Sequence, residues 1–183
     1  PTRRSSDLMS IVLPAYNEEQ MIEKTAGTIA RLMENEDISY ELVFVNDGSK
    51  DQTWERIKEA SKKNSNIKGI CFSRNFGKEG AVFAGLANAS GDCVAVMDCD
   101  LQHPPETLIT MYRLWEQGYQ VIEGVKASRG REGFLHKFFA KTFYKIISNA
   151  TGVDMSRASD FKLLDGAAVD EFLKLPERNV FFR

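Results

Sequence analysis

The sequence contains little cysteine, and the spacing of its cysteines argues against a disulfide framework. Only Cys71, Cys93 and Cys99 occur among 183 residues, an odd number without paired spacing, which fits a reducing compartment. The chain also lacks the uninterrupted apolar run of roughly 18 residues that a membrane-spanning helix requires. Residues 1–7 lack the apolar segment of a signal peptide, and we expect residues 1–9 to form a flexible tail.

An overall excess of positive charge is absent as well. Lysine and arginine number 24, aspartate and glutamate number 26, and the formal net charge is −2. This balance argues against a protein that binds nucleic acid through its overall charge. The bases are nevertheless concentrated in residues 126–145, which contain six bases and one acid. Hydrophobic residues make up 43% of the chain, enough to form a core and to exclude wholesale disorder.

Two common nucleotide-binding motifs are missing. Gly77, Gly80 and Gly85 do not fit the G-x-G-x-x-G spacing of dinucleotide-binding proteins, which argues against a nicotinamide-dependent oxidoreductase. Gly77 and Lys78 are followed by Glu79, whereas a P-loop requires serine or threonine after the lysine.

The sequence does contain short apolar runs that alternate with helical patterns. We expect strands at residues 10–14, 42–45, 67–72, 93–97 and 121–125. Helices are expected at residues 21–33, 77–89 and 104–115, and Ser49 with Gln52 forms a capping box that predicts a further helix through Ala60. Continuous apolar strands separated by helices are typical of an α/β fold, in which a mostly parallel, doubly wound sheet carries helices on both faces.

Polar residues follow four of the expected strands at their carboxyl ends. Ligands of open α/β sheets bind at this edge, so these segments together predict a binding site. The segments are residues 14–18, 46–49, 73–78 and 98–102.

Asp98 and Asp100 are the strongest metal-binding candidates. Two carboxylates two residues apart, directly after an apolar strand, can converge on one hard cation such as Mg²⁺ or Mn²⁺, and Gln102 can add a further oxygen. In the alternative interpretation Asp98 caps the following helix and Asp100 is simply solvated.

Five ordered segments of the chain resemble the family-two glycosyltransferases, which have the Rossmann-like GT-A fold. The resemblance covers residues 10–183 and implies one GT-A catalytic domain. The run MDCDLQHPPE is similar to the branch that contains polyprenyl-phosphate glycosyltransferases and dolichol-phosphate mannose synthase. The segments are IVLPAYNEE, ELVFVNDGSKDQT, FSRNFGKEGAVFAGLANASGD, VAVMDCDLQHPPE and ASDFKLLD.

The resemblance implies a set of residues that bind a nucleotide-sugar donor. Asp47 resembles the acid that accepts a hydrogen bond from the base, whereas Asn46 stands where many relatives have a first aspartate. Lys78 can meet the charge of the diphosphate, or it is an exposed lysine at a helix start, and Tyr16 can instead be packed in a turn. Cys99 is expected to be a small packed side chain within the acidic motif. The implied donor-binding residues are Pro14, Ala15, Tyr16, Glu18, Asp47, Lys78, Asp98 and Cys99.

The resemblance also implies an inverting, metal-dependent displacement. A divalent ion bridging the diphosphate neutralises the charge that develops on the leaving group, which places Asp100 among the catalytic residues. Asp160 resembles a residue facing the acceptor, where it acts as a base or orients the acceptor. A phosphate acceptor hardly needs a base, since its second pKa near 6 leaves it mostly dianionic. Alternatively, Asp160 is a strand-edge carboxylate that fixes a loop.

The basic segment bears on the acceptor. Aromatic residues crowd residues 134–147, and Lys137, Lys141 and Lys145 form a stripe, a pattern that suits a helix lying on an anionic membrane surface. A core helix with a solvated lysine face is the alternative. Four nearby residues are candidates for binding the acceptor phosphate or the donor diphosphate. One of them, Lys126, stands where the family usually has arginine, and lysine cannot make the same bidentate contact. The four candidates are Lys126, Arg129, Arg131 and His136.

Taken together, these features predict transfer of a hexose from a nucleotide sugar, with UDP favoured, to polyprenyl (undecaprenyl) phosphate at the cytoplasmic face of the cell membrane. A saccharide acceptor and a non-catalytic nucleotide-sugar-binding module are the alternatives. We also expect C-terminal membrane segments beyond residue 183, and the family resemblance suggests a homo-oligomer.

Overall fold

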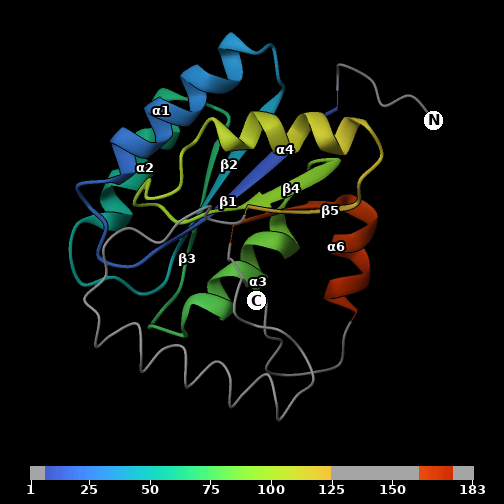
Figure 1. Cartoon of the computed structure of the whole chain (residues 1–183). Coiled ribbons are helices and arrows are strands. Elements are labelled where there is room, and N and C mark those ends of the chain that lie inside the picture. Colours follow the sequence, from blue (N-terminus) through green and yellow to red (C-terminus); the bar gives the residue numbers. More distant parts are fainter. Residues whose placement is uncertain (1–6, 125–160, 175–183) are drawn as a thin grey trace, which may run out of the picture.

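The computed structural model describes residues 7–124 and 161–174, which form a mixed six-stranded sheet with helices packed against it (Figure 1). The strand order is β3-β2-β1-β4-β6-β5. The strands are β1 (Met9–Ala15), β2 (Tyr40–Asn46), β3 (Ile67–Cys71), β4 (Cys93–Val96), β5 (Val121–Glu123) and β6 (Lys162–Asp165). The helices are α1 (Ile22–Asn35), α2 (Thr53–Lys63), α3 (Lys78–Asn88), α4 (Thr107–Glu116) and α6 (Gly166–Leu173).

The first four strands run parallel and the last two add a mixed edge. β1 pairs in parallel with β2 and with β4, and β2 pairs in parallel with β3. β6 is antiparallel to both β4 and β5. The predicted α/β fold with a mostly parallel sheet is therefore confirmed. β6 was not expected, and it separates β5 from the other predicted strands.

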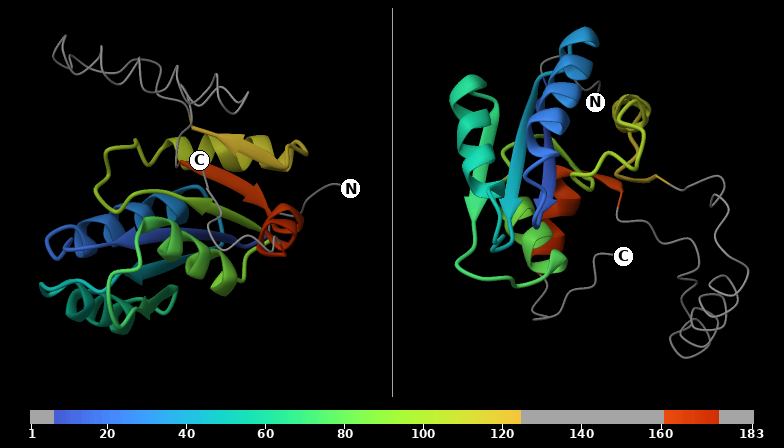
Figure 2. Two further views of the ribbon diagram at one scale, coloured as in Figure 1. Left: turned by 90° about the horizontal axis from the view of Figure 1, so that it is seen from below. Right: turned by 90° about the vertical axis from the view of Figure 1, so that its left-hand side faces the viewer.

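Helices cover both faces of the sheet, as predicted (Figure 2). On one face, α1, α2 and α4 pack over residues of β1 and β2 such as Ile11 and Phe44, and Trp115 is the largest fully buried side chain. On the other face, α3 and α6 pack over Val12 and Val94. Burial of apolar side chains on both faces accounts for the continuous apolar strands in the sequence. Within residues 7–124 and 161–174, no helix is both long and apolar enough to cross a membrane.

The capping-box prediction at Ser49 was wrong. α2 begins at Thr53, and the residue before it makes no side-chain cap. Asp51 serves the first turn instead, because its Oδ1 accepts hydrogen bonds from the Thr53 amide (3.0 Å) and from Thr53 Oγ1 (2.6 Å). The Ser49 hydroxyl has a different partner, because its Oγ accepts a hydrogen bond from the backbone N–H of Asn17 (3.0 Å). Ser49 therefore joins two loops at the carboxyl edge of the sheet.

Candidate functional site

Two loops at the carboxyl ends of β1 and β2 are joined by reciprocal hydrogen bonds. The Asn17 amide donates to Ser49 and the Lys50 amide donates to Asn17 Oδ1 (2.9 Å). Further along, the Glu18 amide donates to Thr53 Oγ1 at 2.8 Å. These bonds occupy backbone groups that would otherwise be exposed at the strand ends, and they give the edge a defined shape. The sequence did not indicate this role for Asn17 and Thr53.

Tyr16, predicted for the nucleotide, lies on the first of these loops. Its side chain is 43% exposed, which argues against the alternative that it is packed in a turn. Ala15 is buried in β1, and its carbonyl accepts the Asp47 amide at 2.9 Å. Pro14 is half-buried in the same strand. An exposed aromatic ring at this edge is free to stack on a planar base.

Asp47 holds the loop that leads from β3 into α3. Its side chain is only 4% exposed, and its two oxygens accept the amides of Phe76 (2.7 Å) and Gly77 (2.9 Å). Gly77 has a φ of +94°, which favours glycine, and α3 begins at the next residue, Lys78. The structure thus gives Asp47 a positioning role, while hydrogen bonding to a base stays a prediction.

Gly48 allows this loop to approach closely. Its φ is +64°, and a Cβ at this position would lie 2.3 Å from the carbonyl carbon of Arg74 and 2.5 Å from the Asn75 nitrogen. Both groups belong to the backbone and cannot rotate away. A side chain at residue 48 would therefore push the loop that carries Phe76 and Gly77 away from Asp47.

Replacing Gly48 by alanine is expected to lower the free energy of unfolding by about 2 kcal/mol, because left-handed backbone and overpacking each cost about 1 kcal/mol or more. Urea denaturation monitored by circular dichroism measures this change. Gly27→Ala is the matched control: Gly27 lies inside α1 with nothing within 4 Å of the added carbon. It should raise the free energy of unfolding by about 0.5–1 kcal/mol. Equal stability of Gly48→Ala and the wild type would contradict the close approach.

Asp98 and Asp100 lie on either side of a buried residue just after β4. Cys99 is 2% exposed, and its carbonyl accepts a 2.6 Å hydrogen bond from Thr25 Oγ1 of α1, which fixes the segment. Asp100 Oδ1 accepts a hydrogen bond from the backbone N–H of Gln102 (3.0 Å). Asp98 does not cap α4, since that helix begins at Thr107. The alternative in which Asp98 caps the following helix is therefore wrong, and its carboxylate is paired with Lys78 instead.

The Lys78 side chain reaches across from α3 to the acidic segment. Its Nζ lies 2.6 Å from Asp98 Oδ1, and both side chains are partly exposed. The sequence placed both residues in the donor site but indicated no contact between them. The structure therefore brings a cation and the acidic pair together at one edge of the sheet.

Glu18 adds negative charge to the same edge. Burial raises the pKa of its carboxyl, and the charges of Asp100, Asp51 and Asp98 raise it further. The carboxyl ends of β1 and β4 thus form one electrostatic environment that favours a cation.

The acidic pair provides a suitable but incomplete ligand set for a divalent ion. Carboxylate oxygens are the ligands that Mg²⁺ and Mn²⁺ prefer, and such ions usually retain waters and share substrate phosphates. Among the described residues, no group of three or more His, Cys, Asp or Glu is arranged to hold a metal ion. Asp98 and Asp100 therefore fit an ion that is completed by ligand oxygens. Ligand roles for Asp98, Asp100 and Gln102 all stay predictions.

The thiol of Cys99 is suited to packing and not to nucleophilic chemistry. Burial raises its pKa to about 12, so that it is protonated at neutral pH. Cys93 is also buried, whereas Cys71 is exposed. We expect iodoacetamide at pH 8 to modify one thiol of the native chain rapidly, at Cys71, and all three after unfolding. Intact-mass spectrometry followed by peptide mapping measures this; rapid labelling of Cys99 in the folded protein would contradict the packing role.

The predicted acceptor residues lie outside the described part of the chain. This holds for Asp160, for the helix expected at residues 134–147, and for the basic and histidine candidates Lys126, Arg129, Arg131 and His136.

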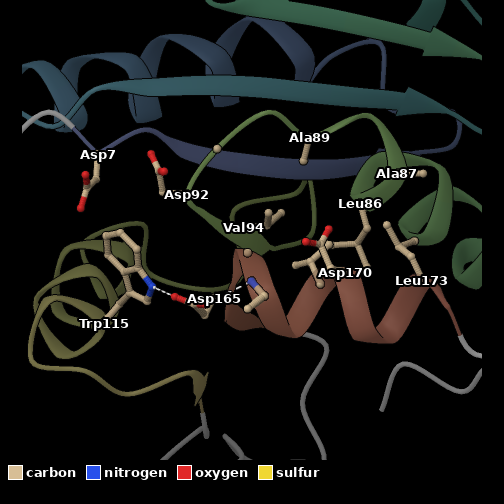
Figure 3. A pocket seen from close by; sticks show the side chains of 14 residues that line it. Asp7, Leu86, Ala87, Ala89, Asp92, Val94, Trp115, Asp165, Asp170 and Leu173 are labelled. Atoms are coloured by element: carbon tan, nitrogen blue, oxygen red, sulfur yellow. Dashed lines mark hydrogen bonds between the residues drawn. The ribbon is translucent and has the colours of Figure 1, made fainter. Parts of the chain in front are cut away.

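A pocket of about 520 Å³ opens at the opposite edge of the sheet (Figure 3). It is lined by residues near the amino-terminal ends of the parallel strands, including Asp92, and none of the predicted site residues lines it. There Asp165 Oδ2 accepts a hydrogen bond from Trp115 Nε1 (2.7 Å), and its Oδ1 accepts the Ala167 amide (3.1 Å) at the start of α6. Asp165 thus ties α4, β6 and α6 together, which indicates a structural role.

A comparison with known sequence families identifies the family of this chain. The model of the family described as "Glycosyl transferase family 2" matches residues 10–163. The chain belongs to glycosyl transferase family 2.

Two curated relatives of this family-two chain match almost its whole length. It is 42% identical over 175 residues to "Uncharacterized glycosyltransferase YkcC" of Bacillus subtilis (strain 168), a match that covers 95% of this chain and 54% of the relative. It is 36% identical over 176 residues to "Bactoprenol glucosyl transferase" of Shigella phage SfV, covering 96% of this chain and 57% of the relative. The chain therefore spans about half the length of the curated relatives it matches.

A solved structure supports the GT-A fold of the family-two chain. It is glucosyl-3-phosphoglycerate synthase from Mycobacterium tuberculosis in complex with Mn²⁺, UDP-glucose and glycerol 3-phosphate. The TM-score is 0.64 at 22% identity, and the match covers 88% of this chain and 57% of that one. The predicted fold class is thereby confirmed.

Proposed function

We propose that this family-two chain is the catalytic part of an enzyme that transfers a hexose, with UDP-glucose preferred, to a polyprenyl phosphate in an inverting reaction. The observation that carries the proposal is the placement of Asp98 and Asp100 on either side of buried Cys99, with Lys78 Nζ 2.6 Å from Asp98. The relative from Shigella phage is named for transfer of glucose to bactoprenol, and the mycobacterial neighbour was solved with Mn²⁺ and UDP-glucose.

The residues at the carboxyl edge would divide the work of binding the donor. The exposed ring of Tyr16 would stack on the base, and Asp47 would keep the start of α3 close to the diphosphate. Asp98 and Asp100 would hold Mg²⁺ or Mn²⁺, which when bound supplies a Lewis acid for the negative charge of the leaving diphosphate. Lys78 would contribute a second positive charge at the same place.

A phosphate acceptor simplifies the rest of the reaction. The acceptor oxygen attacks the anomeric carbon as the bond to the diphosphate breaks, and one in-line displacement inverts that carbon. Because the acceptor is already mostly dianionic at neutral pH, no strong base is required. Asp160 would then orient the acceptor. Residues 134–147 would lie on the cytoplasmic membrane surface, with Lys126, Arg129, Arg131 and His136 close to the phosphates.

A transfer assay tests both the donor and the acceptor. Radiolabelled UDP-glucose is incubated with the chain, Mn²⁺ and vesicles that contain undecaprenyl phosphate, and the lipid is then extracted. We expect label in the lipid fraction, less from GDP-mannose, and little when undecaprenol replaces the phosphate. Transfer to an oligosaccharide in place of the lipid would overturn the proposed acceptor and support the saccharide alternative.

A further inference from the structure

Lys78 forms an ion pair with Asp98, one of the two carboxylates proposed to bind the metal ion. Its ammonium lies 2.6 Å from Asp98 Oδ1, where it competes for oxygen lone pairs that a divalent ion would use. A lysine ammonium and a divalent ion cannot both bind closely to Asp98 Oδ1, because the two cations would repel each other. Binding of a metal ion at Asp98 Oδ1 therefore requires the Lys78 ammonium to move.

A purely structural role explains this ion pair poorly. The side chains of Lys78 and Asp98 are 35% and 36% exposed, and ion pairs that are this accessible to solvent contribute little to stability. Asp98 is not needed to start α3, whose preceding loop is already held by the two bonds from Phe76 and Gly77 to Asp47.

The backbone of Lys78 is fixed while its side chain can move. Asp47 anchors the residues just before it, and α3 is seated closely on β1, where a Cβ on Gly85 would lie 2.2 Å from Val12 Cγ1. Lysine places a compact charge on a flexible four-carbon stem, so its ammonium can exchange partners without movement of the helix.

We infer that Lys78 is an exchangeable counter-ion: it neutralises Asp98 in the nucleotide-free protein and transfers to the diphosphate when metal and nucleotide bind. This inference rests on the proposed function, because it requires a metal site at Asp98 and Asp100. The inference adds to that function a coupling between the binding of the metal ion and the binding of the nucleoside diphosphate. Metal alone must displace Lys78 without compensation, whereas metal with a nucleoside diphosphate provides the ammonium with a new anionic partner. Metal and nucleotide should therefore each strengthen the binding of the other.

Replacing Lys78 by methionine has effects of opposite sign on the two ligands. Methionine keeps most of the apolar stem and removes the charge, so Mn²⁺ alone should bind about threefold more tightly. UDP in the presence of saturating Mn²⁺ should bind about tenfold more weakly, the order expected for loss of one charge-assisted contact. Free Mn²⁺ measured by electron paramagnetic resonance gives the first affinity, and isothermal titration calorimetry gives the second.

Two further variants separate charge from structure. Lys78→Arg retains a cation beside Asp98, so Mn²⁺ alone should bind as weakly as in the wild type. Lys63→Met removes a lysine from another exposed ion pair, that with Glu23, and should alter neither affinity. Circular dichroism confirms that each variant is folded. If Lys78→Met does not fold, weak binding of Mn²⁺ to Lys78→Arg and about threefold tighter binding to Lys78→Gln carry the test.

The outcomes distinguish this inference from the proposed function. If the wild type does not bind Mn²⁺ even with UDP, the metal site and the proposed function fail together. If the wild type binds both ligands and removal of the Lys78 charge leaves the affinity for Mn²⁺ alone unchanged or lowers it, the exchange is wrong and the proposed function stands. Tighter binding of Mn²⁺ with weaker binding of UDP supports the exchange.

Discussion

Replacing Asp100 by asparagine is expected to reduce sugar transfer about a thousandfold, a loss of about 4 kcal/mol of transition-state stabilisation. The substitution keeps the size of the side chain and an oxygen that can accept the Gln102 amide, so the local turn should survive. It removes one of the two negative charges proposed to hold the ion. Initial rates of lipid glucosylation over a range of Mn²⁺ concentrations measure the effect.

Asp37→Asn is the matched control for Asp100→Asn. Asp37 is exposed in the turn after α1 and has a φ of +54°, a conformation that asparagine also adopts readily. Its rate should equal that of the wild type. If Asp100→Asn is folded and transfers sugar at more than about a tenth of the wild-type rate, the acidic pair does not carry the chemistry.

Replacing Asp47 by alanine is expected to lower the free energy of unfolding by about 3 kcal/mol, because each hydrogen bond to a charged group contributes about 1.5–3 kcal/mol. The change leaves the amides of Phe76 and Gly77 without their acceptor oxygens beside a residue that is almost fully buried. Urea denaturation measures the loss, and UDP titration in the presence of Mn²⁺ should show weaker binding because the start of α3 is released.

Asp47→Asn separates the two bonds held by Asp47. Asparagine keeps one acceptor oxygen and replaces the other by an N–H donor. The free energy of unfolding of Asp47→Asn should therefore lie between those of Asp47→Ala and the wild type, or below both if its amide group clashes with a backbone N–H. A stability of Asp47→Ala within about 0.5 kcal/mol of the wild type, the range of an ordinary surface substitution, would contradict the anchoring role.

Most helices and strands could be predicted from local sequence patterns. The predictions failed where the structure depends on contacts between residues that are far apart in the sequence. The apolar runs at residues 42–45 and 93–97 marked β2 and β4 because both faces of these strands are buried. β6 was missed because its sequence, KLLD, contains only two apolar residues and its partners, β4 and β5, are distant in the sequence. The capping box failed at Ser49 because its hydroxyl bonds to Asn17, more than thirty residues away, a contact that no local pattern encodes.

The members of the site could be predicted from the sequence, whereas their contacts could not. Asp98, Asp100 and Lys78 were each indicated by strand ends or by the family resemblance. Their pairing depends on how α3 is placed across from β4, which is set by Gly48, Gly85 and Asp47 through close approaches and two hydrogen bonds. Such contacts depend on the folded sheet and have no local signature. The predicted role of Asp160 at the acceptor stays untested, because this residue lies outside the described part of the chain.

Anomalous diffraction from crystals soaked with Mn²⁺ and UDP-glucose tests the central claim most directly. Data collected at the manganese absorption edge should show one strong peak within about 2.3 Å of oxygens from both Asp98 and Asp100 and of the diphosphate, a distance typical of hard cations and oxygen ligands. A peak elsewhere on the protein, or bound nucleotide without any peak near these carboxylates, would contradict the account.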